Sequence, residues 1–308
     1  MTLAKNSLAT FTLVLLAAAM LQAQETASGR LHHPDREWHA MGSVPCAWSG
    51  PVGKTDGSVD VEGTIQRLQS NGFRCNVFVM TNDWASFQKL VPAADAAGID
   101  LWPVLIPPSE GADSHPYDAD YVTWAKALAK LSVRYPHLRG FNIDDIDQGN
   151  SPNTFTRKYL CQIYRAKQTI NPRLQFVPTI YDLDTTVADR LAGCVDGAWL
   201  WWVNLEKATG LPSFLENTRL AVKGRFPIYG GVYAQGTSWH KSGEPLPKVF
   251  QETLEDTCRY ADGAVIWLLS LKEGDPLLAI TETFTKGGSS LYADKCGTRS
   301  YSPVTKRK

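Results

Sequence analysis

Three aspartates stand within four positions at the end of an apolar segment. Residues 140–143 (GFNI) are typical of a buried strand, and Asp144, Asp145 and Asp147 follow them. Adjacent buried carboxyls repel each other and lose hydration, so the pKa of one rises and that acid stays protonated near neutral pH. General acid catalysis at an acetal uses a protonated carboxyl of this kind. We therefore predict that Asp144 and Asp145 form a catalytic pair.

Two other interpretations of these acids involve no acid–base chemistry. Asp147, together with Ser151 and Thr154, could cap a helix that starts near Phe155, and we favour capping or solvation for Asp147. Three aspartates in four positions could also bind a cation through hard oxygen ligands. The stretch lacks the spacing of an EF-hand loop, so the predicted site contains no metal.

The elements that must position these acids alternate along the chain. Between the expected strands lie segments of helical period, many of which end on turn signals such as Asn71-Gly72 and Asn171-Pro172. This alternation predicts an α/β fold, a single-domain (β/α)8 TIM barrel. An open doubly wound sheet is the competing architecture, but no GxGxxG motif follows the first strand. The expected strands are 39–44, 75–80, 101–106, 140–143, 175–180, 198–203, 227–233 and 264–269, and the expected helices are 60–70, 120–135, 155–170, 186–194, 212–222, 247–260 and 276–284.

The barrel fixes where the side chains of the fourth strand point. With the alternation of a strand, Asn142 and Asp144 face the interior, whereas Phe141 and Ile143 pack against helices. Asp145 then begins the following loop and can lean over the mouth. Because active sites of such barrels lie at the carboxyl ends of the strands, the acid pair is expected there.

Other expected strand ends carry aromatic and polar residues. Aromatic rings pack on the apolar faces of sugars, and Asn, Asp and Tyr side chains bond to hydroxyl groups. For Trp102, Trp124 and Trp199 we expect ordinary core packing instead. The predicted carbohydrate-binding residues are Asn82, Trp84, Tyr181, Asp182, Trp202, Asn204, Tyr233, Trp239 and Trp267.

The N-terminus indicates export. Lys5 precedes the apolar run 11–21 and a small residue, Ala23, which is the pattern of a secretory signal peptide. The run is too short for a membrane anchor, which needs about 20 residues. We therefore expect a signal peptide at 1–23, the barrel at 35–285, a polar tail at 286–308, and a secreted or periplasmic protein.

Export also changes the interpretation of the six cysteines. They form no CxxC pair, and an oxidising compartment permits disulfides. Proximity along the chain suggests Cys161 with Cys194, and Cys258 with Cys296, although several of the cysteines could be buried thiols. Acidic and basic residues both number 31, so the net charge argues against a nucleic-acid scaffold or an electrostatic membrane binder.

Two motifs together resemble those of one enzyme family. Asp144-Asp145-Ile146 and Pro178-Thr179-Ile180-Tyr181 are similar to the motifs after strands four and five in retaining β-N-acetylglucosaminidases of the O-GlcNAcase and bacterial hyaluronidase type. The resemblance implies that Asp144 orients and polarises an acetamido group, that Asp145 is the general acid/base, and that Tyr181 contacts the sugar. The segment 140–144 also resembles a chitinase strand, with Ile146 in place of that family's catalytic Glu.

These observations lead to one prediction and two alternatives. We expect a secreted glycoside hydrolase that acts on a polysaccharide or glycoconjugate as a monomer, without cofactor or metal. After removal of the signal peptide we expect neither a membrane nor a nucleic acid as partner. The alternatives are a non-catalytic carbohydrate-binding barrel and a metal-dependent hydrolase that uses the acid pair with a histidine such as His240.

Overall fold

The described part of the chain forms a closed ring of parallel strands. The computed structural model describes residues 45–80, 84–236, 243 and 245–286. Every strand pair among them is parallel, in the order β5-β4-β3-β2-β1-β9-β8-β7-β6. The strands are β1 (Cys46–Trp48), β2 (Cys75–Met80), β3 (Asp100–Leu105), β4 (Gly140–Ile143), β5 (Gln175–Phe176), β6 (Thr179–Ile180), β7 (Ala198–Trp201), β8 (Ile228–Tyr233) and β9 (Ala264–Trp267).

The two short strands β5 and β6 belong to one barrel strand, residues 175–180, which we call strand five. β5 pairs with β4, and β6 pairs with β7. Between them, the N–H of Val177 donates to the Phe141 carbonyl at 3.0 Å, and Pro178 accepts from the N–H of Trp199 at 2.9 Å. The stretch therefore joins the two ends of the sheet, and eight barrel strands close the (β/α)8 ring that the sequence predicts.

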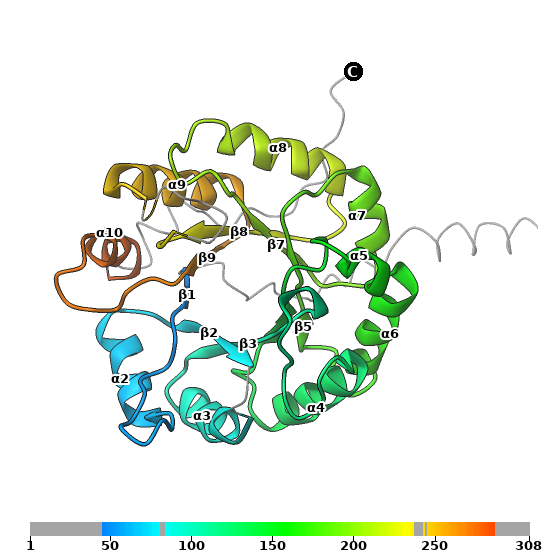
Figure 1. The fold of residues 1–308 in the computed structure, drawn as a ribbon, viewed down its shortest axis with the longest axis horizontal. Coiled ribbons are helices and arrows are strands. Elements are labelled where there is room, and N and C mark those ends of the chain that lie inside the picture. Colours follow the sequence, from blue (N-terminus) through cyan, green and yellow to red (C-terminus); the bar gives the residue numbers. More distant parts are fainter. Residues whose placement is uncertain (1–44, 81–83, 237–242, 244, 287–308) are drawn as a thin grey trace, which may run out of the picture. The chain divides into compact units, whose positions relative to one another are not determined.

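Helices connect successive strands and surround the ring (Figure 1). Several begin at an aspartate whose carboxylate accepts a hydrogen bond from an N–H in the first turn, as Asp60, Asp120, Asp184 and Asp275 do. The helices are α2 (Val61–Ser70), α3 (Trp84–Ala96), the 3₁₀ turn η1 (Pro108–Glu110), α4 (Tyr121–Arg134), α5 (Ser151–Thr154), α6 (Arg157–Gln168), α7 (Thr185–Leu191), α8 (Leu211–Val222), α9 (Pro247–Tyr260) and α10 (Pro276–Thr285).

Alternating side chains divide the apolar core into two layers. Phe141 and Ile143 of β4 lie in the larger cluster, between strands and helices, as expected. The smaller cluster fills the barrel and includes Trp102, Trp199 and Trp201. Glycines make room for these indoles, since a Cβ at Gly231 would lie 2.1 Å from the Trp201 ring. The barrel interior is therefore a packed aromatic core.

The first strand and helix α3 differ from the sequence prediction. The first strand is Cys46–Trp48, and the expected strand 39–44 lies outside the described residues. Three residues are too few for a visible strand pattern. Helix α3 was not among the expected segments because Pro92 stands inside it, where proline normally breaks a helix. The predicted signal peptide and residues 287–308 also lie outside the described part.

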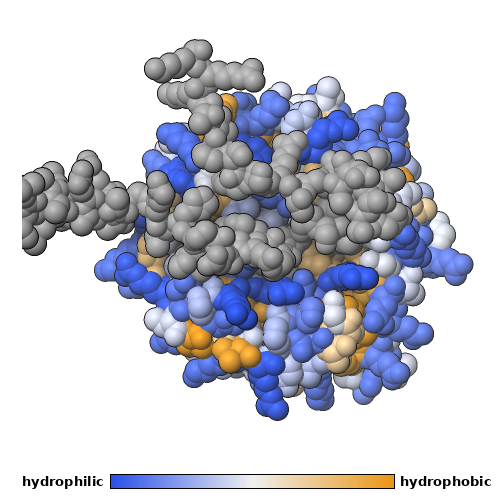
Figure 2. All heavy atoms as spheres, turned by 180° about the vertical axis from the view of Figure 1, so that it is seen from behind, coloured by the Kyte–Doolittle hydropathy of each residue, from blue (hydrophilic) through white to orange (hydrophobic). Residues whose placement is uncertain are grey.

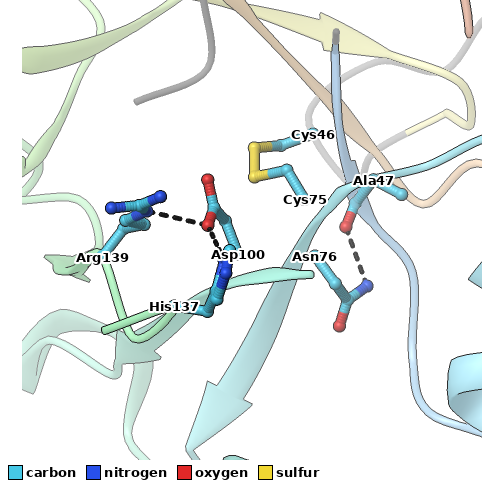
Figure 3. The surroundings of a disulfide bond; sticks show 7 residues. All are labelled: Cys46, Ala47, Cys75, Asn76, Asp100, His137 and Arg139. Atoms are coloured by element: carbon cyan, nitrogen blue, oxygen red, sulfur yellow. Dashed lines mark hydrogen bonds and ion pairs between the residues drawn. A yellow bond between two sulfur atoms is a disulfide. The ribbon is translucent and has the colours of Figure 1, made fainter. Parts of the chain in front are cut away.

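A disulfide and ionic contacts link the amino ends of strands β1 to β4. A disulfide joins Cys46 and Cys75, the first residues of β1 and β2 (Figure 3). At the start of β3, Asp100 contacts His137 at 2.7 Å and Arg139 at 2.8 Å, two residues that precede β4. Contacts at this end of a barrel contribute to stability rather than to chemistry.

The predicted disulfide Cys161–Cys194 is confirmed and links α6 to the segment after α7. The predicted pairing of Cys258 with Cys296 involves a residue outside the described part. Beside this link, Lys167 and Asp196 form a fully buried ion pair with a nitrogen–oxygen distance of 2.5 Å. One Asp196 oxygen also accepts from the backbone N–H of Phe176, so the pair fixes strand five against β7.

The described outer surface is mostly hydrophilic in the view of Figure 2, with hydrophobic residues in separate small patches. This agrees with helices that bury one face against the barrel and expose the other to water. Of the helices that the structure describes, none is long and apolar enough to cross a bilayer.

Candidate active site

A cavity of about 370 Å³ opens at the carboxyl ends of the strands. It is opposite to the end that carries the Cys46–Cys75 disulfide. Residues from every strand of the ring, or directly after it, contribute to its wall. The lining residues are Trp48, Val79, Val104, Ile106, Glu110, Asp144, Asp145, Tyr181, Trp201, Tyr233, Trp267 and Leu268.

The backbone after β4 turns so that both acids line this cavity. The N–H of Asp144 donates to the Leu105 carbonyl of β3 at 3.0 Å, which continues the ladder. Asp145 then adopts a left-handed conformation, with φ of 45°. Aspartate tolerates this conformation better than most residues, and such backbone is concentrated at functional sites. In a continued strand, Asp145 would face the helices instead of the cavity.

The two carboxyls have different surroundings. Burial, followed by repulsion from Asp145 and Glu110, raises the pKa of Asp144 well above its ordinary value. Burial also raises the pKa of Asp145, which is 7% exposed, while a hydrogen bond from Tyr181 acts in the opposite direction. Oδ1 of Asp145 is buried and has no hydrogen-bond partner among the described residues. A buried polar atom of this kind is costly unless a ligand or a proton satisfies it.

Strand five supplies the groups that hold the acids in place. Thr179 lowers the pKa of Asp144 through a hydrogen bond, and it also bonds to the amide of Asn142 at 3.1 Å. Tyr181 bonds to Asp145 and to Tyr233, and burial raises the pKa of both tyrosines. Both hydroxyls therefore remain protonated and can donate hydrogen bonds near neutral pH.

Asp147 connects strands four and five instead of capping a helix. Its Oδ2 accepts from the backbone N–H groups of Tyr181 at 2.9 Å and Asp182 at 3.3 Å. The helix that was expected near Phe155 begins at Arg157, and the hydroxyl of the preceding Thr156 caps it. The capping prediction for Asp147 was therefore wrong, and its observed contacts position the backbone of Tyr181.

The cavity unites five of the eleven predicted site residues. Those in its wall are Asp144, Asp145, Tyr181, Tyr233 and Trp267. Asn82 and Trp239 are outside the described residues. The other four, Trp84, Asp182, Trp202 and Asn204, do not line this cavity.

Local contacts explain the positions of three of these residues. Trp84 stacks on Phe87 and meets the edge of Trp124 between helices α3 and α4. Trp202 packs against Phe214 of α8. Asn204 accepts a hydrogen bond from the N–H of Glu206 within its own loop. A polar neighbour in the sequence does not distinguish a cleft from the start of a helix or a turn.

Seven wall residues were not predicted from the sequence, and three of these seven are aromatic or acidic. Trp48 and Trp201 are the last residues of β1 and β7, and the centroids of their rings lie 5.7 Å apart. Glu110 reaches the cavity from η1, where partial burial and repulsion by Asp145 raise its pKa. The strand-end rule could have identified Trp201, whereas no local pattern marks Glu110 in its loop.

A metal site was one alternative interpretation of the acids. In the described stretches of the chain, no group of three or more His, Cys, Asp or Glu side chains is placed to hold a metal ion. His240, the histidine considered for such a site, lies outside those stretches.

Comparison with known proteins identifies the fold but no family. No protein-family model and no curated protein matches the sequence. Among solved structures, Cel5A from Thermotoga maritima, determined in complex with cellobiose, has a TM-score of 0.56 at 10% identity over 78% of this chain and 98% of its own. An endo-β-N-acetylglucosaminidase from Cordyceps militaris has a TM-score of 0.51 at 13% identity, over 80% and 90%.

A family GH18 chitinase from Chromobacterium violaceum also has a TM-score of 0.51 at 13% identity, over 80% of this chain and 84% of its own. The chain therefore has the TIM-barrel fold of these glycoside hydrolases. At such identities the likeness concerns the fold, so function must be argued from the site.

Proposed function

We propose that this protein is a glycoside hydrolase that cleaves a polysaccharide or glycoconjugate through Asp144 and Asp145. The observation that carries the proposal is the position of two adjacent acids with raised pKa values inside an aromatic-walled cavity at the carboxyl ends of the strands. The glycoside hydrolases among the structural neighbours support it, since they use the same fold.

In this mechanism Asp145 is the general acid/base. Its carboxyl lines the cavity, and its raised pKa keeps a proton available for the glycosidic oxygen as the bond to the anomeric carbon breaks. Once it has lost the proton, the carboxylate can accept one from an incoming water, whose oxygen forms the new bond to the anomeric carbon. The Tyr181 hydroxyl stabilises this ionised form by donating a hydrogen bond.

Asp144 has a different task because its pKa is raised further and Thr179 and Asn142 hold its surroundings. A protonated Asp144 avoids a second negative charge beside Asp145 and can donate a hydrogen bond to the sugar. If that sugar carries an acetamido group, Asp144 would orient and polarise it, as the resemblance of the Asp144-Asp145-Ile146 motif implies. The endo-β-N-acetylglucosaminidase and the chitinase among the structural neighbours support this assignment.

The first test compares wild-type protein with Asp145→Asn on aryl glycosides and on natural glycans. We expect the rate constant kcat on glycans to fall by about 10²–10⁴-fold, because the proton donor is lost. The loss should be smaller for aryl glycosides whose leaving groups need no proton. Glu62→Gln makes the same carboxyl-to-amide change on the outer surface of α2 and should leave the rate unchanged.

Equal turnover by Asp145→Asn and wild type would remove the assignment of Asp145. Glycan binding without any product over long incubation would favour a non-catalytic binding barrel, for which the same aromatic wall would suffice.

We also propose that the protein acts outside the cytoplasm. The disulfides Cys46–Cys75 and Cys161–Cys194 support an oxidising compartment, in agreement with the signal-peptide pattern at 1–23. Expression with and without residues 1–23, followed by fractionation, tests this: export should require the segment.

A further inference from the structure

The acidic and basic side chains in the described wall of the cavity are all carboxyls. Asp144 and Asp145 follow β4, and Glu110 faces the same space from η1. No lysine, arginine or histidine is present among the described residues of the wall. The nearby Arg190 interacts with Asp147, outside the wall. An anionic group that entered this space would therefore meet carboxyls and no described cation.

The rest of the wall favours a ligand that is apolar on its faces and uncharged at its edges. Trp201 and Tyr233 have ring centroids 5.0 Å apart, and Tyr233 meets Trp267 at 5.5 Å, so aromatic surface continues along one side. Two buried polar atoms, Nε1 of Trp201 and Oδ1 of Asp145, have no partner in the described chain. A hydroxyl group of a ligand could pair with either kind of atom, because it both accepts and donates.

From this arrangement we infer that the sugar unit bound beside Asp145 carries no negative charge. The site takes neutral sugars or amino sugars and rejects uronic acids and sugars sulfated on the bound ring. This inference deepens the proposed function and rests on it. It also excludes uronate-containing glycans as ligands of this cavity, because their carboxylates pair most strongly with arginine or lysine.

Glu110 is the specificity-determining residue in this inference. The two aspartates serve the reaction, whereas Glu110 comes from another loop and adds a third carboxyl to the wall. Placing a uronate near it costs both repulsion and desolvation, because the partly buried space screens charge less than water does.

Binding of an anion should therefore be linked to proton uptake. The titratable groups that face the space are Asp144, Asp145 and Glu110, together with the hydroxyls of Tyr181 and Tyr233. The two tyrosines and, in the proposed mechanism, the two aspartates already hold their protons near pH 7, so Glu110 and the bound anion are the groups left to take up protons. The discrimination should be largest at neutral pH and should shrink as the pH falls and both Glu110 and the uronate become protonated.

The test uses pairs of oligosaccharides that share a linkage and differ only at C6: cello-oligosaccharides against cellouronates, β-1,4-manno-oligosaccharides against mannuronates, and α-1,4-galacto-oligosaccharides against galacturonates. Binding is measured by calorimetry on full-length Asp145→Asn, which should hold the ligand without turnover. In the pair whose neutral member binds, we expect the uronate to bind at least about tenfold more weakly at pH 7.

Glu110→Gln should narrow this ratio, whereas the surface control Glu62→Gln should not. A uronate that binds within about threefold of its neutral partner, or more tightly, overturns the inference and leaves the proposed hydrolase untouched. An unchanged ratio in Glu110→Gln removes the role of Glu110. Selective binding of neutral glycans without cleavage by the wild type would contradict the hydrolase and support the inference. Binding of no glycan at all would overturn both.

Discussion

Asp144 and Asp145 have different surroundings because the backbone directs their side chains differently. Asp144 is the last inward position of a strand, under the influence of Thr179, whereas Asp145 occupies a left-handed turn and contacts Tyr181. Identical side chains can therefore hold different protonation states. The assignment of roles rests on this difference.

Tyr181→Phe tests the contact between Tyr181 and Asp145. The hydroxyl lowers the pKa of Asp145, so its loss should raise that pKa further. Because a general acid works only while protonated, the alkaline limb of the pH–rate profile should move to higher pH. We also expect kcat to fall by about 10–100-fold, the loss of a hydrogen bond to a charged group. An alkaline limb that does not move would mean that Tyr181 does not act on the acid.

Asp144→Asn should stabilise the protein at neutral pH. The pKa of Asp144 is raised in the folded state above its ordinary value near 3.8, so the folded protein binds the proton more tightly than the unfolded chain. Its contribution to stability is fully present below pH 3.8 and is lost as the pH rises through the folded pKa. We expect the Tm of Asp144→Asn to exceed that of the wild type by about 2–4 °C at pH 7 and to match it near pH 3. A lower Tm at pH 7 would contradict the pKa shift.

At the scale of elements, the strand ends could be predicted and the loops could not. Apolar runs marked seven of the eight barrel strands, and the rule that sites lie at strand ends brought Asp144, Tyr181, Tyr233 and Trp267 together. Glu110 was missed because its loop has no period that relates it to strand four. Trp84 was misjudged because a tryptophan that follows polar residues can also begin a helix.

The barrel strands depend on glycines that face tryptophans. Gly231→Ala in β8 would place a methyl group 2.1 Å from the Trp201 ring, which is closer than a normal contact. We expect a loss of about 1–3 kcal/mol in the free energy of unfolding, measured by denaturant titration, with weaker ligand binding since Trp201 lines the cavity. Gly50→Ala is the matched control, because a Cβ at Gly50 meets no atom within 4 Å. An equal effect of both substitutions would contradict the close packing.

At the scale of the whole molecule, the candidate active site and the stabilising contacts lie at opposite ends of the barrel. The disulfide Cys46–Cys75 and the contacts of Asp100 hold the amino ends, and the carboxyl ends carry the acids. A barrel fixed at one end can vary the loops at the other. This is consistent with structural neighbours that share the fold at 10–13% identity.

The disulfide Cys161–Cys194 should contribute to global stability without entering the chemistry. It closes a loop with a sequence separation of 33 and lies on the helical side of the barrel. Replacing both cysteines by alanine should lower the free energy of unfolding by about 2–4 kcal/mol. Thermal unfolding of the oxidised protein measures this loss, and kcat at 25 °C should be retained. A large loss of activity with unchanged Tm would contradict the assignment.

The indoles of Trp48, Trp201 and Trp267 surround the space in which a ligand must sit. Tryptophan emission responds to the polarity around the ring, so a molecule that displaces water from these three side chains changes the fluorescence of the protein. Ligand binding can therefore be followed through the fluorescence of the tryptophans in the cavity wall. A library of glycans can be screened by emission alone, before any cleavable substrate has been found.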